Sequence, residues 1–350
     1  MRGSGNGYQK LRNSSRIRKN GDGKPGVDAS YLNGRHEITA SSFTRVSTET
    51  RNLGLFSQDR IHDPRSLDLF GGPLLIVHEA PPVMTGRIGV SVSDKDVVFN
   101  QSFYGYSPLG FSEAKILVRY LALVFGSELV TWIALMTSGR FGVEREAIEK
   151  ATLDRIPIPD FRKLTRSQKE EISTLFEGLK TSEQSWGEVD RWVAELYGLG
   201  SRDLQVISDT LQFSLPYAQN KRDAQASPTK KEQARFCSVL ATELQPWCER
   251  FGSKVSVCRI DLPASSPWYG IKVQTAYADN GTSAGEDDWE GLMRAADDAA
   301  ASEVILRDRE GALLIGRLAQ RRYWSETQAR LLAQRIAWSH IDLLHRKVDA

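Results

Sequence analysis

The sequence predicts an α+β fold, and three patterns lead to this prediction. Residues 73–101 hold a short apolar run and alternating segments typical of strands. Helical periodicity takes over in residues 112–213, and residues 232–344 mix both kinds of pattern. The length of 350 residues allows two or three domains, since a domain usually holds about 100–200 residues. An apolar fraction of 40% and a charged fraction of 26% are ordinary for a globular protein.

Residues 1–42 are rich in Gly, Ser, Asn, Arg and Lys and predict a flexible basic arm, with structure beginning around Phe43. Residues 1–35 carry eight basic and two acidic side chains, a net charge of +6. The basic ones are Arg2, Lys10, Arg12, Arg16, Arg18, Lys19, Lys24 and Arg35. Such a segment adds salt-dependent affinity for phosphate backbones. The alternative is a tail without a role, or an expression-vector remnant at "MRGS".

Two strand signals follow. Pro73–His78 ("PLLIVH") is an apolar run between Gly71-Gly72 and the Pro81-Pro82 pair, which predicts a buried strand. Arg87–Gln101 alternates apolar and polar residues on both sides of the turn sequence Asp-Lys-Asp, which predicts a hairpin.

Residues 116–136 form the most apolar stretch and predict two consecutive buried helices. Arg119 and Glu128 interrupt the stretch, each costing about 2.5–3.5 kcal/mol near a bilayer centre, and Gly126-Ser127 divides it. No apolar run follows the basic residues of the N-terminus, as a secretory signal requires. We therefore expect a cytoplasmic protein without a membrane partner.

The segment Ile156-Pro157-Ile158-Pro159 predicts an extended stop after these helices, because proline cannot continue a helix and disfavours the helical conformation of its predecessor. Three helices are then expected in a small bundle over 162–219, the first opened by capping boxes at Thr165 and Ser167. A polar linker over 220–231 leads to a C-terminal α+β domain over 232–350. Its expected elements are helices at 232–251, 286–300 and 325–344, strands at 254–262 and 269–278, and a hairpin at 303–318.

Enzyme signatures are missing from the sequence. The three cysteines form no C-x-x-C pair, the five histidines form no i, i+4 pair, and no phosphate-binding G-x-x-x-x-G-K-[ST] occurs. We therefore expect no cofactor, no metal and no catalytic residue. A weaker reading is a metal-dependent nuclease, in which Asp96 and Glu113 hold Mg²⁺ and Lys115 polarises the phosphate. The alternative is a purely structural role: Asp96 is an ordinary turn residue, and Glu113 and Lys115 lie at the start of a helix.

A family resemblance rests on three stretches: "GGPLLIVHEAP", "GRIGVSVSDKDVVFNQSFYGYS" and "LALVFGSELVTWIALMTSGRFGVEREAIEKATLDRIPIPDF". In this order they resemble the target recognition domain that follows the catalytic domain in fused N6-adenine DNA methyltransferases of restriction–modification and phage-defence systems. The stretch "DRWVAELYGLGSRDLQVISDTL" is similar to the helices after that domain. Phe125-Gly126-Ser127 departs from the Leu-Asn-Ser that the family often has.

The resemblance implies a DNA target recognition domain of α/β type over 43–161, which reads double-stranded DNA. The family's Asn/Asp-Pro-Pro-Tyr/Phe loop, which holds a flipped adenine, is absent, as is a motif for S-adenosylmethionine. The expected function is thus a specificity module without enzyme activity, whose protein partner carries the methyltransferase or effector activity. The expected DNA-binding residues are Arg87, Lys95, Asn100, Gln101, Tyr104, Tyr106, Arg140 and Arg145. Each of them is otherwise an ordinary solvated loop residue.

Those residues have assigned roles under this reading. Asn100 and Gln101 would pair with an adenine edge, and Arg87 or Lys95 with guanine. Tyr104 and Tyr106 would stack on bases or reach phosphates. Arg140 and Arg145 would contact the DNA backbone. The alternative function is a non-catalytic scaffold subunit of a bacterial defence complex. Acidic residues over 286–298 favour a protein partner for the C-terminal domain, or are a solvated helix face.

Overall fold

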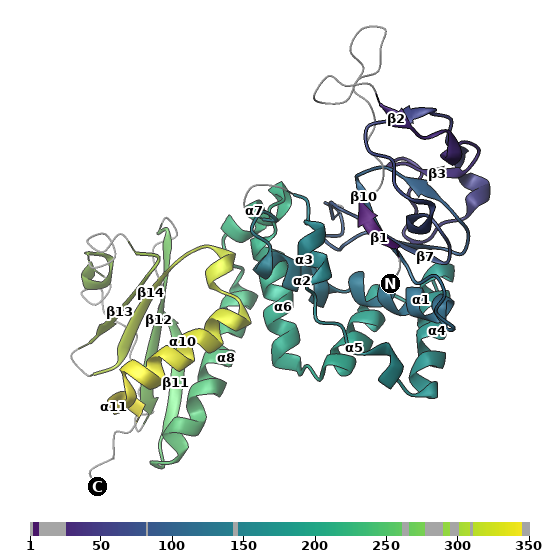
Figure 1. Cartoon of the computed structure of the whole chain (residues 1–350). Helices are drawn as coiled ribbons and strands as arrows, with labels where there is room; N and C mark the ends of the chain where they lie inside the picture. The colour runs from purple at the N-terminus through teal and green to yellow at the C-terminus, as the bar shows by residue number, and fades with distance from the viewer. Residues whose placement is uncertain are drawn as a thin grey trace, which may run out of the picture. The chain divides into compact units, whose positions relative to one another are not determined.

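The computed structural model describes residues 3–6, 26–81, 83–142, 146–260, 266–276, 290–294, 301–308 and 311–344. It confirms the α+β fold class, with helices and four sheets among these residues. The chain divides into two compact units (Figure 1). Unit 1 holds residues 1–211 and 215–217, and unit 2 holds residues 212–214 and 218–350.

A five-stranded sheet in the order β1-β10-β7-β8-β4 forms the centre of unit 1. Neighbouring strands are antiparallel except for β4, which runs parallel to β8. The strands of unit 1 are β1 (Gly3–Asn6), β2 (Val27–Asp28), β3 (His36–Ile38), β4 (Val46–Ser47), β5 (Gly54–Leu55), β6 (Arg60–Ile61), β7 (Leu74–His78), β8 (Val90–Ser93), β9 (Val98–Phe99) and β10 (Phe103–Ser107).

Strand β7 is buried on both faces, as its apolar run predicts. Leu75 and Val77 belong to a core shared with the helices of the unit. Leu74 and Ile76 belong to a second core, formed mainly with residues between 29 and 70, and we call residues 26–70 the N-terminal lobe. Alternate side chains of one strand point to opposite faces, so a strand covered on both sides reads as a continuous apolar run.

The expectation of a flexible arm over residues 1–42 is wrong for the residues of this stretch that the structure describes. Strand β1 is paired along the edge of the main sheet. Residues 26–42 contain β2, β3 and the 3-10 helix η1 (Ser30–Leu32), and Ala29, Leu32 and Ile38 are fully buried. Of the expected arm, residues 1–2 and 7–25 lie outside the described residues.

The hairpin expected over residues 87–101 is also wrong. Strand β8 belongs to the main sheet, whereas β9 leaves it and pairs parallel with β3, Ile38 opposite Phe99. The turn between them is kept: Asp96 lies there, accepting from Gly72 N at 3.0 Å and from Arg35 Nη1 at 3.1 Å.

The helices of unit 1 pack against one face of the main sheet (Figure 1). They are α1 (Ala114–Phe125), α2 (Glu128–Thr137), α3 (Lys150–Asp154), α4 (Arg166–Thr181), α5 (Trp186–Tyr197) and α6 (Ser201–Ser214), whose last three residues fall in unit 2. At the break between α1 and α2, the close approach of Trp186 leaves no room for a side chain on Gly126. A Cβ on Gly126 would lie 2.3 Å from Cη2 of Trp186, and Ser127 caps α2 by accepting from Val130 N.

The Ile-Pro-Ile-Pro segment is not helical, as predicted, and it also closes the core. Ile156 is buried and Ile158 packs against the same core. The two proline carbonyls accept hydrogen bonds from Tyr197 at 2.8 Å and Tyr120 at 2.9 Å. Helices α4 to α6 then form where their periodicity predicts, but they share one core with the sheet and are not a separate domain.

Unit 2 is the expected C-terminal α+β unit. Its antiparallel sheet has the order β11-β12-β14-β13, and α8 and α10 lie on one face over a common core. Its elements are α7 (Ala218–Gln225), α8 (Lys230–Glu249), β11 (Lys254–Ile260), β12 (Trp268–Ala276), β13 (Glu303–Arg307), β14 (Leu313–Leu318), α10 (Glu326–Ser339) and α11 (Ile341–Leu344).

Two expectations for unit 2 need correction. The linker predicted over 220–231 is mostly helical, because α7 and the start of α8 occupy it. The final helix predicted over 325–344 is interrupted at His340. Of the acidic stretch 286–298, only residues 290–294 are described, and they are helical.

No single helix in the described part of the chain is long and apolar enough to cross a membrane. Helices α1 and α2 pass that test only as a pair with a 64° bend between them. Both contribute most of their apolar side chains to the core of unit 1.

Candidate DNA-contacting surface

One end of the main sheet collects several of the residues expected to bind DNA. The register sets Phe103 opposite His78, so the turn before β10 lies at the end of β7. Glu79 N donates to Ser102 O at 2.9 Å, and Ile148 N donates to Glu79 O at 2.7 Å. We call the surface formed by Glu79, residues 100–102 and residues 146–149 the turn end of the sheet.

At the turn end, Asn100 and Gln101 have different positions. The side-chain oxygen of Asn100 accepts from Ser102 N at 3.0 Å, which is the geometry of an Asx turn. Gln101 is exposed at the apex of the turn. Reading of adenine uses both the oxygen and the nitrogen of one amide. Gln101 is therefore the better placed of the two.

Lys95 lies at the opposite end of the sheet. It belongs to the turn after Ser93, which pairs with Leu74 at the start of β7, and its side chain is exposed. Residues 74 and 78 are separated by four strand residues, or about 13 Å at the usual rise. Lys95 and Gln101 therefore do not form one contact surface.

Arg87 does not face solvent in the way its predicted role requires. Its guanidinium donates to Asp190 Oδ1 at 2.9 Å and to Glu128 Oε1 at 2.8 Å, and its side chain is only 13% exposed. Burial acts to lower the pKa of Arg87, but the hydrogen bond and charge of Asp190 outweigh it, so the pKa is raised. Arg87 joins the sheet to α2 and α5, and the expectation of a guanine contact is wrong.

Trp186 lies in the same junction. The guanidinium carbons of Arg45 and Arg87 are 5.7 and 5.9 Å from the ring centroid of Trp186. Asp190 accepts a further bond from Glu128 N at 2.9 Å, which holds the start of α2. Sequence reasoning missed this junction, because no local pattern connects residues so distant along the chain.

The expectation for the two tyrosines of β10 is also wrong, because both are buried. Tyr104 donates to Ile148 O at 2.9 Å, and Tyr106 donates to Asp154 Oδ1 at 3.1 Å. Burial raises the pKa of Tyr104 to about 12, and burial also raises the pKa of Tyr106. Their rings fill the core under the helices and are not available to stack on bases.

Arg140 lies near the turn end and is accessible. Its Nε is 3.1 Å from Glu149 Oε1, and its side chain is 48% exposed. Lys150 and Asp154 form a second ion pair nearby. The turn end itself holds three carboxylates, those of Glu79, Glu146 and Glu149, of which Glu149 pairs with Arg140. Arg145 lies outside the described residues.

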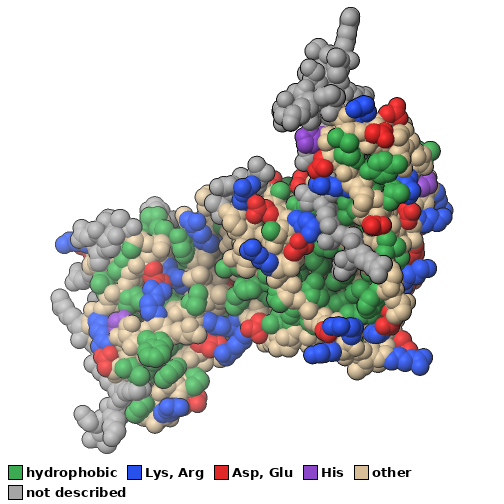
Figure 2. All heavy atoms as spheres, viewed as in Figure 1, with side chains coloured by type: hydrophobic (Ala, Val, Ile, Leu, Met, Phe, Trp, Pro, Cys, Tyr) green, Lys and Arg blue, Asp and Glu red, His purple; other side chains and the backbone are tan. Residues whose placement is uncertain are grey.

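The basic segment starts from the turn end. Asn6, the last residue of β1, lies opposite Tyr104, and the described chain resumes at Gly26, whose carbonyl accepts from Arg60 Nε at 2.7 Å. Residues 7–25 between them contain six basic residues and one aspartate, a net charge of +5. On the face shown in Figure 2, the described cations and carboxylates are interspersed, so a single-sign field is not apparent there.

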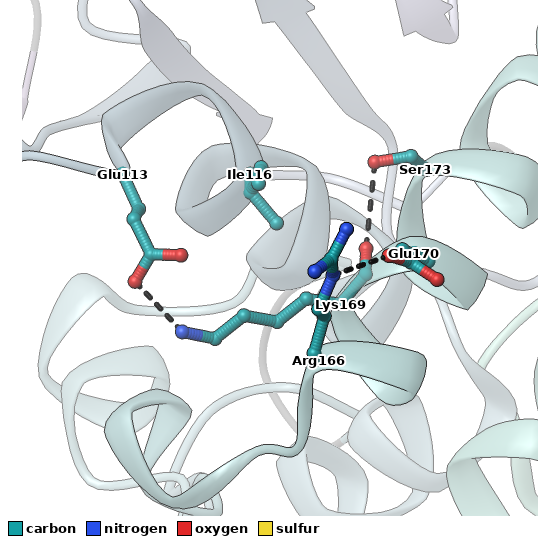
Figure 3. A pocket seen from close by; sticks show the side chains of 6 residues that line it. All are labelled: Glu113, Ile116, Arg166, Lys169, Glu170 and Ser173. Atoms are coloured by element: carbon teal, nitrogen blue, oxygen red, sulfur yellow. Dashed lines mark hydrogen bonds and ion pairs between the residues drawn. The ribbon is translucent and has the colours of Figure 1, made fainter.

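A surface pocket of about 480 Å³ lies between α1 and α4 (Figure 3). Its charged residues pair with each other: Lys169 with Glu113 at 2.7 Å and Arg166 with Glu170 at 2.8 Å. Asp96 is bonded elsewhere, as described above. Among the described residues no group of three His, Cys, Asp or Glu side chains could hold a metal ion, so the nuclease reading gains no support.

Comparison of the chain with protein families, curated proteins and solved structures finds no match. The resemblance to a target recognition domain therefore rests on the sequence motifs alone.

Proposed function

We propose that the protein is a sequence-specific DNA-recognition module without catalytic activity of its own, acting in the cytoplasm with a separate methyltransferase or effector subunit. The observation that carries the proposal is the composition of the turn end. An exposed amide, Gln101, lies there, and an accessible cation, Arg140, and the start of a segment of charge +5 adjoin it.

The division of labour follows from charge and geometry. The basic segment supplies affinity without sequence preference, since each phosphate contact releases counterions. Full use of its charge gives a slope of log K against log salt of about −4 to −5, at about −0.9 per phosphate. Gln101 supplies base readout, which for a bidentate contact is about 1–3 kcal/mol of discrimination.

The test is selection from a randomised duplex pool at two salt concentrations. Deletion of residues 1–42 is unsuitable, because β1 and the buried residues of 26–42 are part of unit 1. The variant to use instead changes the six basic residues of the segment to glutamine. They are Lys10, Arg12, Arg16, Arg18, Lys19 and Lys24.

We expect the wild type to enrich a short motif, and the neutralised variant to enrich the same motif with weaker binding and a flatter salt dependence. Salt-sensitive binding without any motif, lost on neutralisation, would reduce the protein to a basic tail and contradict the proposal.

A second candidate function, a protein-interaction scaffold, is favoured by the helices of unit 2. Trp338 on α10 is 87% exposed and Trp247 on α8 is 41% exposed. Exposed tryptophans are typical of protein interfaces. Failure of the wild type to bind any duplex, together with self-association or partner binding that Trp338→Ser abolishes, would favour this function over the first.

A further inference from the structure

The loop between β7 and β8 exposes two apolar side chains. Val83 is 56% exposed and Met84 is 94% exposed, the highest value for a large apolar side chain among the described residues. Single exposed apolar residues are common on protein surfaces. Val83 and Met84 are two such residues next to each other in one turn.

The stem of this loop is held on both sides. His78 Nδ1 is 2.7 Å from Ala80 O, and Tyr217 donates to the carbonyl of Pro81 at 2.9 Å. On the other side, Gly86 has a φ of +60°, and a Cβ there would lie 2.7 Å from Leu215 Cδ1. The next residue, Arg87, is fixed by its ion pairs. The residues on both sides of Val83 and Met84 are thus held by these contacts, which keep the two apolar side chains at the surface.

The loop begins at the turn end of the sheet. Its first residue, Glu79, is bonded to Ser102 and thereby adjoins the turn that carries Gln101. The start of the loop, the exposed amide and the anchor of the basic segment therefore share one end of unit 1.

We propose that Met84, supported by Val83, is an apolar wedge that enters between two stacked base pairs of the bound duplex. This inference rests on the proposed DNA-recognition function. Methionine and other apolar side chains are used in this way by proteins that kink DNA. Pyrimidine–purine steps unstack most easily, so the wedge adds a preference for such a step beside the bases that Gln101 reads.

The wedge is tested with the most enriched duplex from the pool, in which 2-aminopurine replaces each adenine in turn. The fluorescence of 2-aminopurine rises when its neighbours unstack. We expect the wild type to raise it at one step, and Met84→Ala to abolish the rise and weaken binding about tenfold or more, the equivalent of a buried methionine side chain. Met84→Leu should restore both.

The control is Leu331→Ala, which removes a 49% exposed apolar side chain from unit 2 and should change neither signal. Because Met84 is almost fully exposed, its variants should have the same melting temperature as the wild type. Sequence-selective binding without any fluorescence rise, or a rise that Met84→Ala retains, overturns the wedge and leaves the proposed function standing. Absence of duplex binding by the wild type overturns both.

Discussion

The ion pair between Arg87 and Asp190 allows the sharpest test of the structure. Their side chains are 13% and 16% exposed, so neither charge is well screened by water. Asp190→Ala removes the two bonds from Arg87 and the bond from Glu128 N. Loss of one partner of a buried pair costs about 3–5 kcal/mol. We take the lower end, about 3 kcal/mol, because Glu128 still pairs with Arg87 at 2.8 Å.

This loss should appear in calorimetry as a shift of one transition. Unit 1 has the size for which 1 kcal/mol corresponds to about 2–4 °C, so its melting temperature should fall by about 6–12 °C. The transition of unit 2 should stay in place and serves as an internal reference. In a double-mutant cycle with Arg87→Met and Asp190→Leu, we expect a coupling of about 2 kcal/mol, because the double variant leaves neither of these two charges without its partner.

The matched control is Arg166→Ala. Arg166 pairs with Glu170 four residues later on α4, but its side chain is 93% exposed. Such a pair contributes about 0.5 kcal/mol or less. If Asp190→Ala destabilises unit 1 no more than Arg166→Ala does, the junction is not structural. Arg87 would then be free for the base contact that the sequence suggested.

Three further predictions concern packing and protonation. Gly126→Ala should lower the melting temperature of unit 1, at a cost of about 1–3 kcal/mol, because its Cβ would fall 2.3 Å from a tryptophan ring. Gly139→Ala, with open space around it, should leave the melting temperature unchanged. Equal effects of the two variants would refute this prediction. Burial raises the pKa of Glu128, so the stability linked to its protonation is present below its ordinary pKa of 4.5 and is lost as pH rises through the raised value. The melting temperature of Glu128→Gln relative to wild type should therefore be more favourable at neutral pH than near pH 4.5, and an unchanged difference would contradict this. Burial raises the pKa of Tyr104 and Tyr197 to about 12, so spectrophotometric titration should show them ionising after the exposed tyrosines, and stability should fall as pH rises from about 10 towards that value; ionisation near 10 in the folded protein would refute the burial.

Local signals in the sequence explain what was predicted correctly. Helix α4 begins at the capping box of Thr165 and Gln168, whose reciprocal bonds are 2.9 and 3.2 Å long. Strand β7 could be predicted from its apolar run, because both of its faces are buried. In each case a few consecutive residues hold the information.

Long-range partners explain what was missed. Val98-Phe99 continues an alternating pattern that fits a hairpin, yet it pairs with Glu37-Ile38, and nothing nearby indicates that choice. The strands of the N-terminal lobe are only two or three residues long, too short for any periodicity to show.

The candidate site shows the same limit. Tyr104 and Tyr106 lie two residues apart, so a strand must point both to one face, but alternation alone does not reveal that this face is the core. Arg87 looks like a loop residue until its carboxylate partner appears 103 positions later. Gln101 was named only through the family resemblance, at the end of an expected hairpin strand, whereas the structure places it exposed in a turn.

The central claim is tested most directly by the ratio of affinities for the enriched duplex and a scrambled duplex at one fixed salt concentration. The account predicts a ratio of about a thousandfold or more for the wild type. Gln101→Ala should lower this ratio by about tenfold or more. Gln225→Ala, which changes an exposed glutamine of α7, should leave the ratio unchanged. Neutralising the basic segment should weaken both affinities while preserving the ratio. A wild-type ratio near one would contradict the account.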